Sequence, residues 1–217
     1  MDGFPEIKVC GVTDAQFARR AAELGVDYLG FIFAEGSPRR ITPEKAAGIA
    51  AVLLGKVKKV GVFTAASAHE ILEIARCVPL DVVQLHSLDY GADEIQRLKT
   101  AGLEVWRLYG ALSDLDYGAD GILLDGKDPV RSDGNRGPAD GIERMGGTGQ
   151  LADWRRAAEL AAAGVRVALA GGISAENAAA AAKTGCAVLD VNSSLETAPG
   201  VKSIERLEAF MSAVRSG

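Results

Sequence analysis

The chain has 217 residues, of which 48% are hydrophobic, and this is sufficient for one globular domain with a sizeable core. Its 24 basic and 29 acidic side chains give a formal net charge of −5 without a block of like charges, so we expect no nucleic-acid partner. The longest apolar-leaning stretch, residues 160–173, is interrupted by Gly164 and Arg166 and is too short to span a bilayer. We therefore also expect no membrane association.

The chain contains three cysteines, Cys10, Cys77 and Cys186, and their spacing is not that of a metal site. The sequence begins without a basic and apolar signal segment. We expect a reduced, cytoplasmic protein without a bound metal ion. Cys77 and Cys186 are interpreted as structural residues.

Candidate strands alternate with candidate helices along the chain. The strands are expected to begin near Ile7, Tyr28, Lys59, Val82, Glu104, Gly121, Val167 and Ala187. The clearest helical patterns cover residues 14–23, 42–53, 67–75, 151–163 and 175–183, whereas residues 110–117 have a weak pattern. Because strands that alternate with helices form a parallel sheet with right-handed crossovers, the sequence predicts an α/β fold.

Eight such units close most naturally into a single (β/α)8 barrel, the TIM barrel, over residues 1–217. A doubly wound open sheet is the alternative, but residues 10–13 after the first strand lack the glycine-rich dinucleotide-binding pattern. The gap after the sixth strand is unusually long. Its first part, about residues 126–150, is rich in Gly, Asp and Pro and is expected to form a long loop, either a lid over the barrel mouth or a flexible insertion.

Reactive side chains follow several of the predicted strands. Cys10 ends the first strand, His86 the fourth and Asp125 the sixth, while Asn192 follows the eighth. In (β/α)8 barrels the functional residues come from the loops at the C-terminal ends of the strands. We therefore expect these side chains to meet at the barrel mouth.

Cys10 and Asp125 are candidates for opposite roles in proton transfer. A Cys10 thiolate is suited to abstract a proton, and a basic neighbour such as Lys8 or Arg39 would favour the thiolate, although a small core residue is the alternative. Asp125 ends an apolar strand, where partial desolvation favours the protonated form and lets a carboxyl group donate a proton at neutral pH. Its alternative role is to form the turn with Gly126.

Two glycines and two serines indicate a phosphate site. Gly171 and Gly172 follow the seventh strand, and Ser193 and Ser194 follow the eighth. These are the two loops in which barrels commonly bind phosphate through backbone N–H groups and hydroxyls. Ordinary turn residues are the alternative, but both loops carry the right chemistry together, so we predict a phosphate site.

Arginine and histidine side chains extend the candidate site. Arg39 and Arg40 are either a solvated pair or a fork for a carboxylate or phosphate of the substrate. His86 is either a satisfied polar residue at the barrel rim or a substrate contact.

Motifs at matching barrel positions run through almost the whole chain. They are KVCGVT (8–13), LGFIF with SPR (29–33, 37–39), VGVF (60–63), VQLH (83–86), LLD (123–125), GGTG with DW (146–149, 153–154), LAGG with EN (169–172, 176–177) and DVNSSLE with PG (190–196, 199–200). Taken together, they resemble the phosphoribosylanthranilate isomerase family of tryptophan biosynthesis.

The resemblance implies a cofactor-free isomerase that catalyses the Amadori rearrangement of N-(5-phosphoribosyl)anthranilate to 1-(2-carboxyphenylamino)-1-deoxyribulose 5-phosphate by general acid and base catalysis. It implies Cys10 as the general base, Asp125 as the general acid and Arg39 as the ligand of the anthranilate carboxylate. We further assign substrate binding to His86 and Asp190. The partner would be a small phosphorylated substrate, and the protein a monomer or homodimer.

The chain departs from the family pattern in three places. Ser194 stands where the family usually has glycine, Asn192 replaces a small hydroxyl residue, and residues 87–89 replace a glycine and an acidic pair. Two alternatives follow from these departures. One is a paralogue that acts on another phosphoribosyl amine, and the other is a non-catalytic barrel that binds a phosphosugar.

Overall fold

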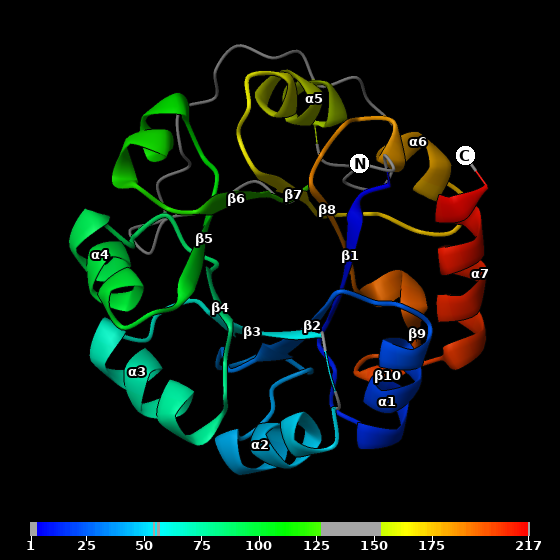
Figure 1. Cartoon of the computed structure of the whole chain (residues 1–217), viewed down its shortest axis with the longest axis horizontal. Helices are drawn as coiled ribbons and strands as arrows, with labels where there is room; N and C mark the ends of the chain where they lie inside the picture. The colour runs from blue at the N-terminus through cyan, green and yellow to red at the C-terminus, as the bar shows by residue number, and fades with distance from the viewer. Residues whose placement is uncertain (1–3, 54, 56, 127–152, 217) are drawn as a thin grey trace.

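The computed structural model describes residues 4–53, 55, 57–126 and 153–216. Its main sheet consists of β1 Glu6–Cys10, β2 Tyr28–Ile32, β3 Lys58–Phe63, β4 Val82–Leu85, β5 Glu104–Leu108, β6 Gly121–Leu124, β7 Val167–Leu169 and β8 Val188–Val191. The strands are parallel and neighbour one another in chain order, and β8 pairs with β1 to close the ring (Figure 1). The predicted (β/α)8 barrel is confirmed, and the open sheet is wrong because the sheet has no free edge.

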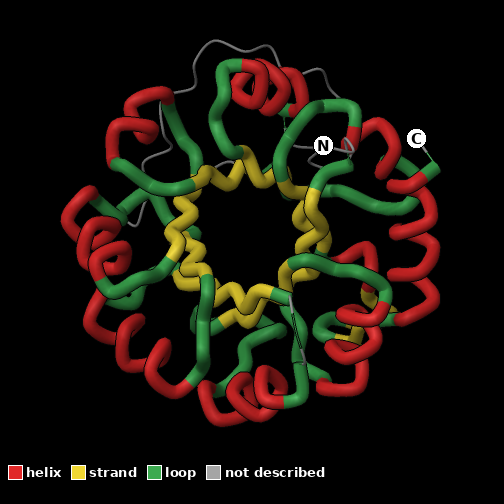
Figure 2. The backbone as a smooth tube through the Cα atoms, viewed as in Figure 1, coloured by secondary structure: helices red, strands yellow, loops and turns green. Residues whose placement is uncertain are grey.

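Helices surround the ring of strands, as Figure 2 shows. They are α1 Ala15–Glu23, α2 Pro43–Ala51, α3 Ala68–Cys77, α4 Ala92–Thr100, the 3₁₀-helix η1 Leu112–Tyr117, α5 Trp154–Ala162, α6 Ala178–Ala182 and α7 Ile204–Arg215. After β8 the chain also forms a short 3₁₀-helix, η2 Ser193–Leu195, and a hairpin of β9 Glu196–Ala198 and β10 Val201–Lys202. Within the described ranges, no helix is long and apolar enough to cross a membrane.

Capping side chains explain where most helices begin. Asp14, Thr42 and Ser67 each accept a hydrogen bond from a backbone N–H in the first turn of α1, α2 and α3. Helix α6 starts at Ala178, three residues later than predicted, because the Asn177 side chain bonds backbone groups of the preceding turn. The ends of α2 and α3 differ from the prediction by two residues, which is the usual scatter of helix termini.

Two expected features fall where the chain is not described. The long loop predicted at about 126–150 lies outside the described residues apart from Gly126, and so does the motif at 146–149. The helix predicted from residue 151 is described from its N-cap, Asp153, onward. The weak helical pattern at 110–117 corresponds to η1, a single short 3₁₀-helix.

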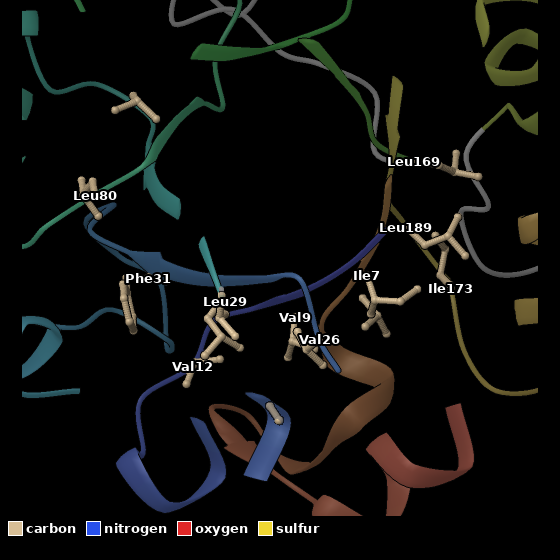
Figure 3. Close-up of a cluster of buried hydrophobic side chains, with 14 of the residues drawn as sticks. Ile7, Val9, Val12, Val26, Leu29, Phe31, Leu80, Leu169, Ile173 and Leu189 are labelled. Carbon is tan, nitrogen blue, oxygen red and sulfur yellow. The ribbon is translucent and has the colours of Figure 1, made fainter. Parts of the chain in front are cut away.

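The barrel strands bury both of their faces in two separate hydrophobic clusters. Outward-facing side chains such as Ile7, Val9 and Leu29 pack against the helices (Figure 3). Inward-facing side chains such as Val60 and Leu123 fill the barrel itself. Because successive residues of a strand point to opposite faces, each strand can place every second side chain inside the barrel and carry it toward the mouth.

The N-terminal end of the barrel is closed by charged side chains. A surface cavity of about 640 Å³ lies there, at the opposite end from Cys10 and Asp125. Its charged side chains pair with one another: Arg166 with Glu6 at 2.5 Å, Lys58 with Glu104 at 3.0 Å, and Lys99 with Asp120 at 2.8 Å. Polar residues at the N-terminal end of such barrels usually stabilise the fold. We therefore assign a structural role to the charged residues that line this cavity.

A buried ion pair holds the 3₁₀-helix η1 against β5. Arg107 Nη1 lies 2.8 Å from Asp114 Oδ1, and the two side chains are 1% and 6% exposed. The other donors of Arg107 bond the backbone carbonyls of residues 88, 90 and 108. The second oxygen of Asp114 accepts hydrogen bonds from the N–H groups of Gly110 and Ala111. The ion pair therefore holds η1 in place as the connection from β5 to β6, where the barrel has a short 3₁₀-helix in place of a full α-helix.

Replacing Asp114 by alanine would leave the Arg107 guanidinium buried without its carboxylate. Because an uncompensated buried charge costs about 3–5 kcal/mol, we expect Asp114→Ala to lower the free energy of unfolding in urea by that amount. Asp116→Ala, at an exposed position of the same 3₁₀-helix, is the matched control and should change it by less than about 0.5 kcal/mol. A loss below about 1 kcal/mol for Asp114→Ala would contradict a stabilising pair.

Candidate active site

The residues expected at the barrel mouth come from four strands. The alternation of side chains turns Lys8 and Cys10 of β1 inward, and it does the same for Gln84 of β4 and Asp190 of β8. Asp125 is the first residue after β6. The fold therefore brings together residues that are more than 100 positions apart in the sequence.

A buried ion pair lies directly below the predicted base. Lys8 and Asp190 are opposite each other in the ladder of β1 and β8, and Lys8 Nζ lies 2.5 Å from Asp190 Oδ2. The Lys8 side chain is fully buried. Burial alone would lower the pKa of Lys8, but the attraction of Asp190 and of the Cys10 thiolate outweighs burial and raises it, so the ammonium group stays charged.

Burial of the Cys10 thiol works against its ionisation. Burial raises the pKa of Cys10, and the Asp190 carboxylate raises it further. The Lys8 and Lys202 ammonium groups lower it, but only in part. The basic neighbour predicted to favour the thiolate is therefore present in Lys8, yet desolvation is the larger effect.

Asp125 lies beside His86 at the mouth. His86 Nε2 is 3.5 Å from Asp125 Oδ2, and the Asp125 side chain is 16% exposed. Both groups also act electrostatically on Asp190, which in turn acts on Cys10. The predicted base and the predicted acid are thus linked through one carboxylate that is within electrostatic range of both.

Two glycines provide space for these functional groups. A Cβ at Gly30 would lie 2.9 Å from the Cys10 sulfur. Gly171 has a φ of +84°, and a Cβ there would lie 2.8 Å from Asp125 Oδ1 and 2.3 Å from the Gly126 nitrogen. Gly171 is therefore required where the loop after β7 crosses the end of β6, whatever its role toward phosphate.

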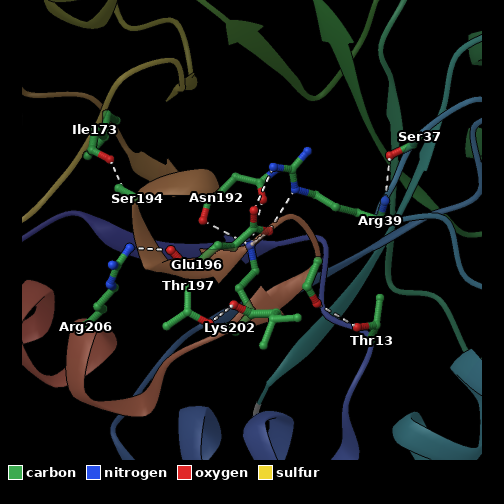
Figure 4. Close-up of polar contacts among 12 residues, drawn as sticks. Thr13, Ser37, Arg39, Ile173, Asn192, Ser194, Glu196, Thr197, Lys202 and Arg206 are labelled. Carbon is green, nitrogen blue, oxygen red and sulfur yellow. Dashed lines mark hydrogen bonds and ion pairs between the residues drawn. The ribbon is translucent and has the colours of Figure 1, made fainter.

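Arg39 is held in a fork by Glu196, as Figure 4 shows. Its Nε and Nη2 donate to the two oxygens of Glu196, each at 2.7 Å. Lys202 Nζ donates to Glu196 at 2.8 Å and to Asn192 Oδ1 at 2.7 Å. Arg40, by contrast, is exposed and lies 3.6 Å from Glu35. Of the two arginines, the structure therefore turns Arg39 toward the mouth.

Glu196 is ionised over the whole ordinary pH range. Burial would raise its pKa, but the hydrogen bonds from Arg39 and Lys202 outweigh burial and lower the pKa to about 2. The sequence placed Glu196 in a family motif without indicating its partner. Lys202 was not predicted as a site residue, because its contacts depend on the β9–β10 hairpin and no local sequence pattern predicted this hairpin.

The two predicted phosphate loops are bonded to each other. The Ser194 hydroxyl donates to the Ile173 carbonyl at 2.6 Å, which ties the loop after β8 to the loop after β7. Asn177 donates to the Gly172 carbonyl and accepts from the Ser174 N–H. Because the Ser194 hydroxyl proton is already used, any contribution of Ser194 to an anion site would come from its backbone.

The geometry first defines a class. This is a (β/α)8 barrel whose C-terminal mouth holds a buried thiol, a carboxyl group, a forked arginine and two connected glycine- and serine-containing loops. Among the described residues, no group of three or more His, Cys, Asp or Glu side chains is placed to hold a metal ion. Proton transfer on an anionic small molecule is the chemistry that these groups support.

Comparisons with known proteins identify the family. The family model described as N-(5'phosphoribosyl)anthranilate (PRA) isomerase matches residues 7–213. A relative from Rubrobacter xylanophilus, an N-(5'-phosphoribosyl)anthranilate isomerase, is 37% identical over 97% of this chain and 99% of its own length. The chain therefore belongs to the N-(5'-phosphoribosyl)anthranilate isomerase family.

Solved structures agree in fold. The phosphoribosyl anthranilate isomerase from Thermus thermophilus is 34% identical, with a TM-score of 0.80, over 97% of this chain and 98% of that chain. A second isomerase was solved in complex with reduced 1-(o-carboxyphenylamino)-1-deoxyribulose 5-phosphate. It is 26% identical, with a TM-score of 0.79, over 98% of this chain and 100% of that chain.

The Glu196 pair predicts a pH-dependent stability. Glu196 has an ordinary pKa of 4.5 and a pKa of about 2 in the folded chain, so its stabilisation is present above pH 4.5 and is lost as the pH falls toward 2. We expect Glu196→Gln to lower the free energy of unfolding by on the order of 3 kcal/mol at pH 7. The difference from wild type should shrink in urea titrations between pH 4.5 and pH 2.

The exposed Glu73 provides a control for this experiment, since Glu73→Gln removes a charge from a surface ion pair. Its stability should follow that of the wild type at every pH. A difference between wild type and Glu196→Gln that stays constant from neutral to acidic pH would contradict the argument.

Proposed function

We propose that this chain catalyses the Amadori rearrangement of N-(5'-phosphoribosyl)anthranilate to 1-(2-carboxyphenylamino)-1-deoxyribulose 5-phosphate. The observation that carries the proposal is the pairing of Cys10 and Asp125 around Asp190 at one barrel mouth, in a member of this isomerase family. A thiol and a carboxyl group at one mouth are suited to the two proton transfers that the rearrangement requires.

Asp125 acts as the general acid. It donates a proton to the ring oxygen of the ribose, the bond between C1′ and the ring oxygen breaks, and the nitrogen lone pair forms a protonated Schiff base at C1′. The partial burial of Asp125 keeps bulk water from competing for this proton. The carboxylate that remains is next to His86, whose imidazole faces it.

Cys10 acts as the general base. The protonated Schiff base acidifies the C2′ proton, Cys10 removes it, and the electron pair of the C–H bond moves toward nitrogen to give an enolamine. Tautomerisation of the enolamine gives the ketone product. The Cys10 thiol must first release its proton to solvent, and the cations of Lys8 and Lys202 oppose the cost of forming the thiolate in a buried site.

Substrate anions are held on two sides of the mouth. Arg39 has five N–H donors, and Glu196 occupies two of them, so the guanidinium is oriented while the others can hold the anthranilate carboxylate. The loops that begin at Gly171 and Ser193 are assigned to the phosphate, together with Gly172 and Ser194. His86 and Asp190 complete the contacts with the sugar.

Cys10→Ala and Asp125→Asn are each expected to lower kcat by at least about 10²-fold while the circular dichroism spectrum stays unchanged, because each removes one proton-transfer group. The assay adds purified protein to N-(5'-phosphoribosyl)anthranilate, without metal or cofactor, and follows the loss of substrate fluorescence. Cys77→Ala, at an exposed cysteine, is the control and should keep wild-type kcat. Retention of more than about a tenth of kcat at either site would overturn that assignment.

Arg39→Ala should mainly raise KM, by roughly 10-fold or more, since a hydrogen-bonded charge contributes about 1.5–3 kcal/mol to binding in both ground and transition states. The exposed neighbour Arg40 is the matched control, and Arg40→Ala should leave KM within about twofold of wild type. If KM is unchanged in Arg39→Ala, another group binds the carboxylate.

A further inference from the structure

Asn192 is a departure from the family pattern to which the reaction described above gives no role. It is the first residue after β8, and the alternation that turns Val188 and Asp190 into the barrel directs its side chain toward the mouth. The residue is half-buried. An amide thus occupies a position where the family usually has a shorter side chain with a single hydroxyl group.

The Asn192 amide lies beside the arginine that we assign to the substrate carboxylate. A Cβ at Gly11 would lie 2.8 Å from Arg39 Cδ and 3.2 Å from Asn192 Oδ1, so both side chains meet over the same glycine. Hydrogen bonds that involve Glu196 and Lys202 connect the two side chains, as Figure 4 shows. The amide and the guanidinium therefore belong to one polar network at the mouth.

Lys202 determines how the amide of Asn192 is turned. Its Nζ donates to Asn192 Oδ1 at 2.7 Å, to the Asn192 carbonyl at 3.0 Å and to Glu196 Oε1 at 2.8 Å. These three acceptors match the three N–H donors of an ammonium group. Burial lowers the pKa of Lys202, but Glu196 opposes this shift. A flipped amide would place its NH2 group against the ammonium donors, so Oδ1 must face Lys202.

The other end of the amide is left as a donor. Nδ2 of Asn192 carries two N–H groups, and within the described ranges neither meets an acceptor. Arg39 also keeps donors after two of them have bonded Glu196. Since Arg39 and Lys202 together carry one more charge than Glu196 neutralises, this part of the mouth suits a monoanion.

We propose that Asn192 is a second binding residue for the substrate carboxylate: Lys202 holds its Oδ1, and its Nδ2 donates to the carboxylate beside Arg39. The inference rests on the proposed function, in which Arg39 binds this group. A carboxylate has two oxygens, so it accepts from the guanidinium and from the amide together. Lys202 is then a positioning residue that orients the amide without contacting the substrate.

Asn192→Asp distinguishes this role from a purely structural one. Aspartate has nearly the same shape, keeps an oxygen for Lys202 and replaces only the NH2 group by a second oxygen. If Asn192 served only to bond Lys202, the variant would bind ligands as the wild type does. If its Nδ2 donates to the carboxylate, the variant instead places a negative charge against that group.

The test compares two ligands that do not react. One is reduced 1-(o-carboxyphenylamino)-1-deoxyribulose 5-phosphate, and the other is the same molecule without its carboxyl group. By calorimetry, Asn192→Ala should raise the Kd of the first about 10-fold and that of the second by less than about twofold, because a hydrogen bond to a charged group is lost only in the first. Asn192→Asp should weaken the first ligand more than Asn192→Ala does, and more than it weakens the second.

Two results would overturn the proposal. Equal losses for the two ligands would mean that Asn192 acts on the phosphate or on the loop, and wild-type affinity of both Asn192 variants for the carboxylated ligand would mean that the amide binds neither. Because Asn192→Asp keeps the bond to Lys202, its result does not depend on loss of that contact.

Lys202→Met tests the orientation of the amide. It removes the donors that hold Oδ1, so the preference for the carboxylated ligand over the carboxyl-free one should fall by about 10-fold. Lys183→Met, at an exposed position after α6, is the matched control and should keep the wild-type preference. An unchanged preference in a folded Lys202→Met variant would contradict the positioning role.

Failure of this inference can be distinguished from failure of the proposed function. A wild type that prefers the carboxylated ligand through Asn192 but does not convert N-(5'-phosphoribosyl)anthranilate would remove the proposed reaction alone. A wild type that catalyses the reaction while its Asn192 variants keep the wild-type preference would remove the inference alone.

Discussion

The ion pair between Lys8 and Asp190 is the interaction on which the site depends. It joins the first strand of the barrel to the last, at the ladder that closes the sheet, and it is almost completely buried. Removing either partner would leave a charge in an apolar barrel, a change that typically costs several kcal/mol. Because Lys8 lies one inward-facing position before Cys10 in β1, the ion pair that joins β1 to β8 also fixes how far Cys10 extends into the barrel mouth.

The two ends of the barrel use charge differently. At the N-terminal end, acidic and basic side chains neutralise each other around Arg166, and we assign none of them to ligand binding. At the C-terminal end, Glu196 orients Arg39 with two of its donors and leaves the rest of the guanidinium available. The same type of ion pair thus contributes stability at one end and orientation at the other.

The fold was accessible from the sequence because it depends on local periodicity. Every strand of the barrel begins within one residue of the predicted position, since an apolar run between helices is visible without any knowledge of its partners. Cys10 and Asp125 could be singled out because each stands at the end of such a run. These predictions required only the order of elements and the rule that strand ends share one face.

Other features depend on distances between segments far apart in sequence. Lys202 has no local signal, because its role arises from contacts with Glu196 and Asn192 in three dimensions. The raised pKa of Cys10 results chiefly from its burial, which sequence does not supply. The late start of α6 resulted from side-chain bonds of Asn177 that compete with the helix.

The hydrogen bond from Ser194 to the Ile173 carbonyl has a consequence for ligand recognition. It ties the loop after β8 to the loop after β7, so the backbone groups that we assign to the phosphate would lose less conformational entropy if an anion bound there. A glycine, which the family usually has at this position, possesses no hydroxyl to form such a tether. With Ser194 the loop lacks the backbone freedom of a glycine but gains a hydrogen bond that preorganises it. A neutral hydrogen bond of this kind contributes about 0.5–1.5 kcal/mol net.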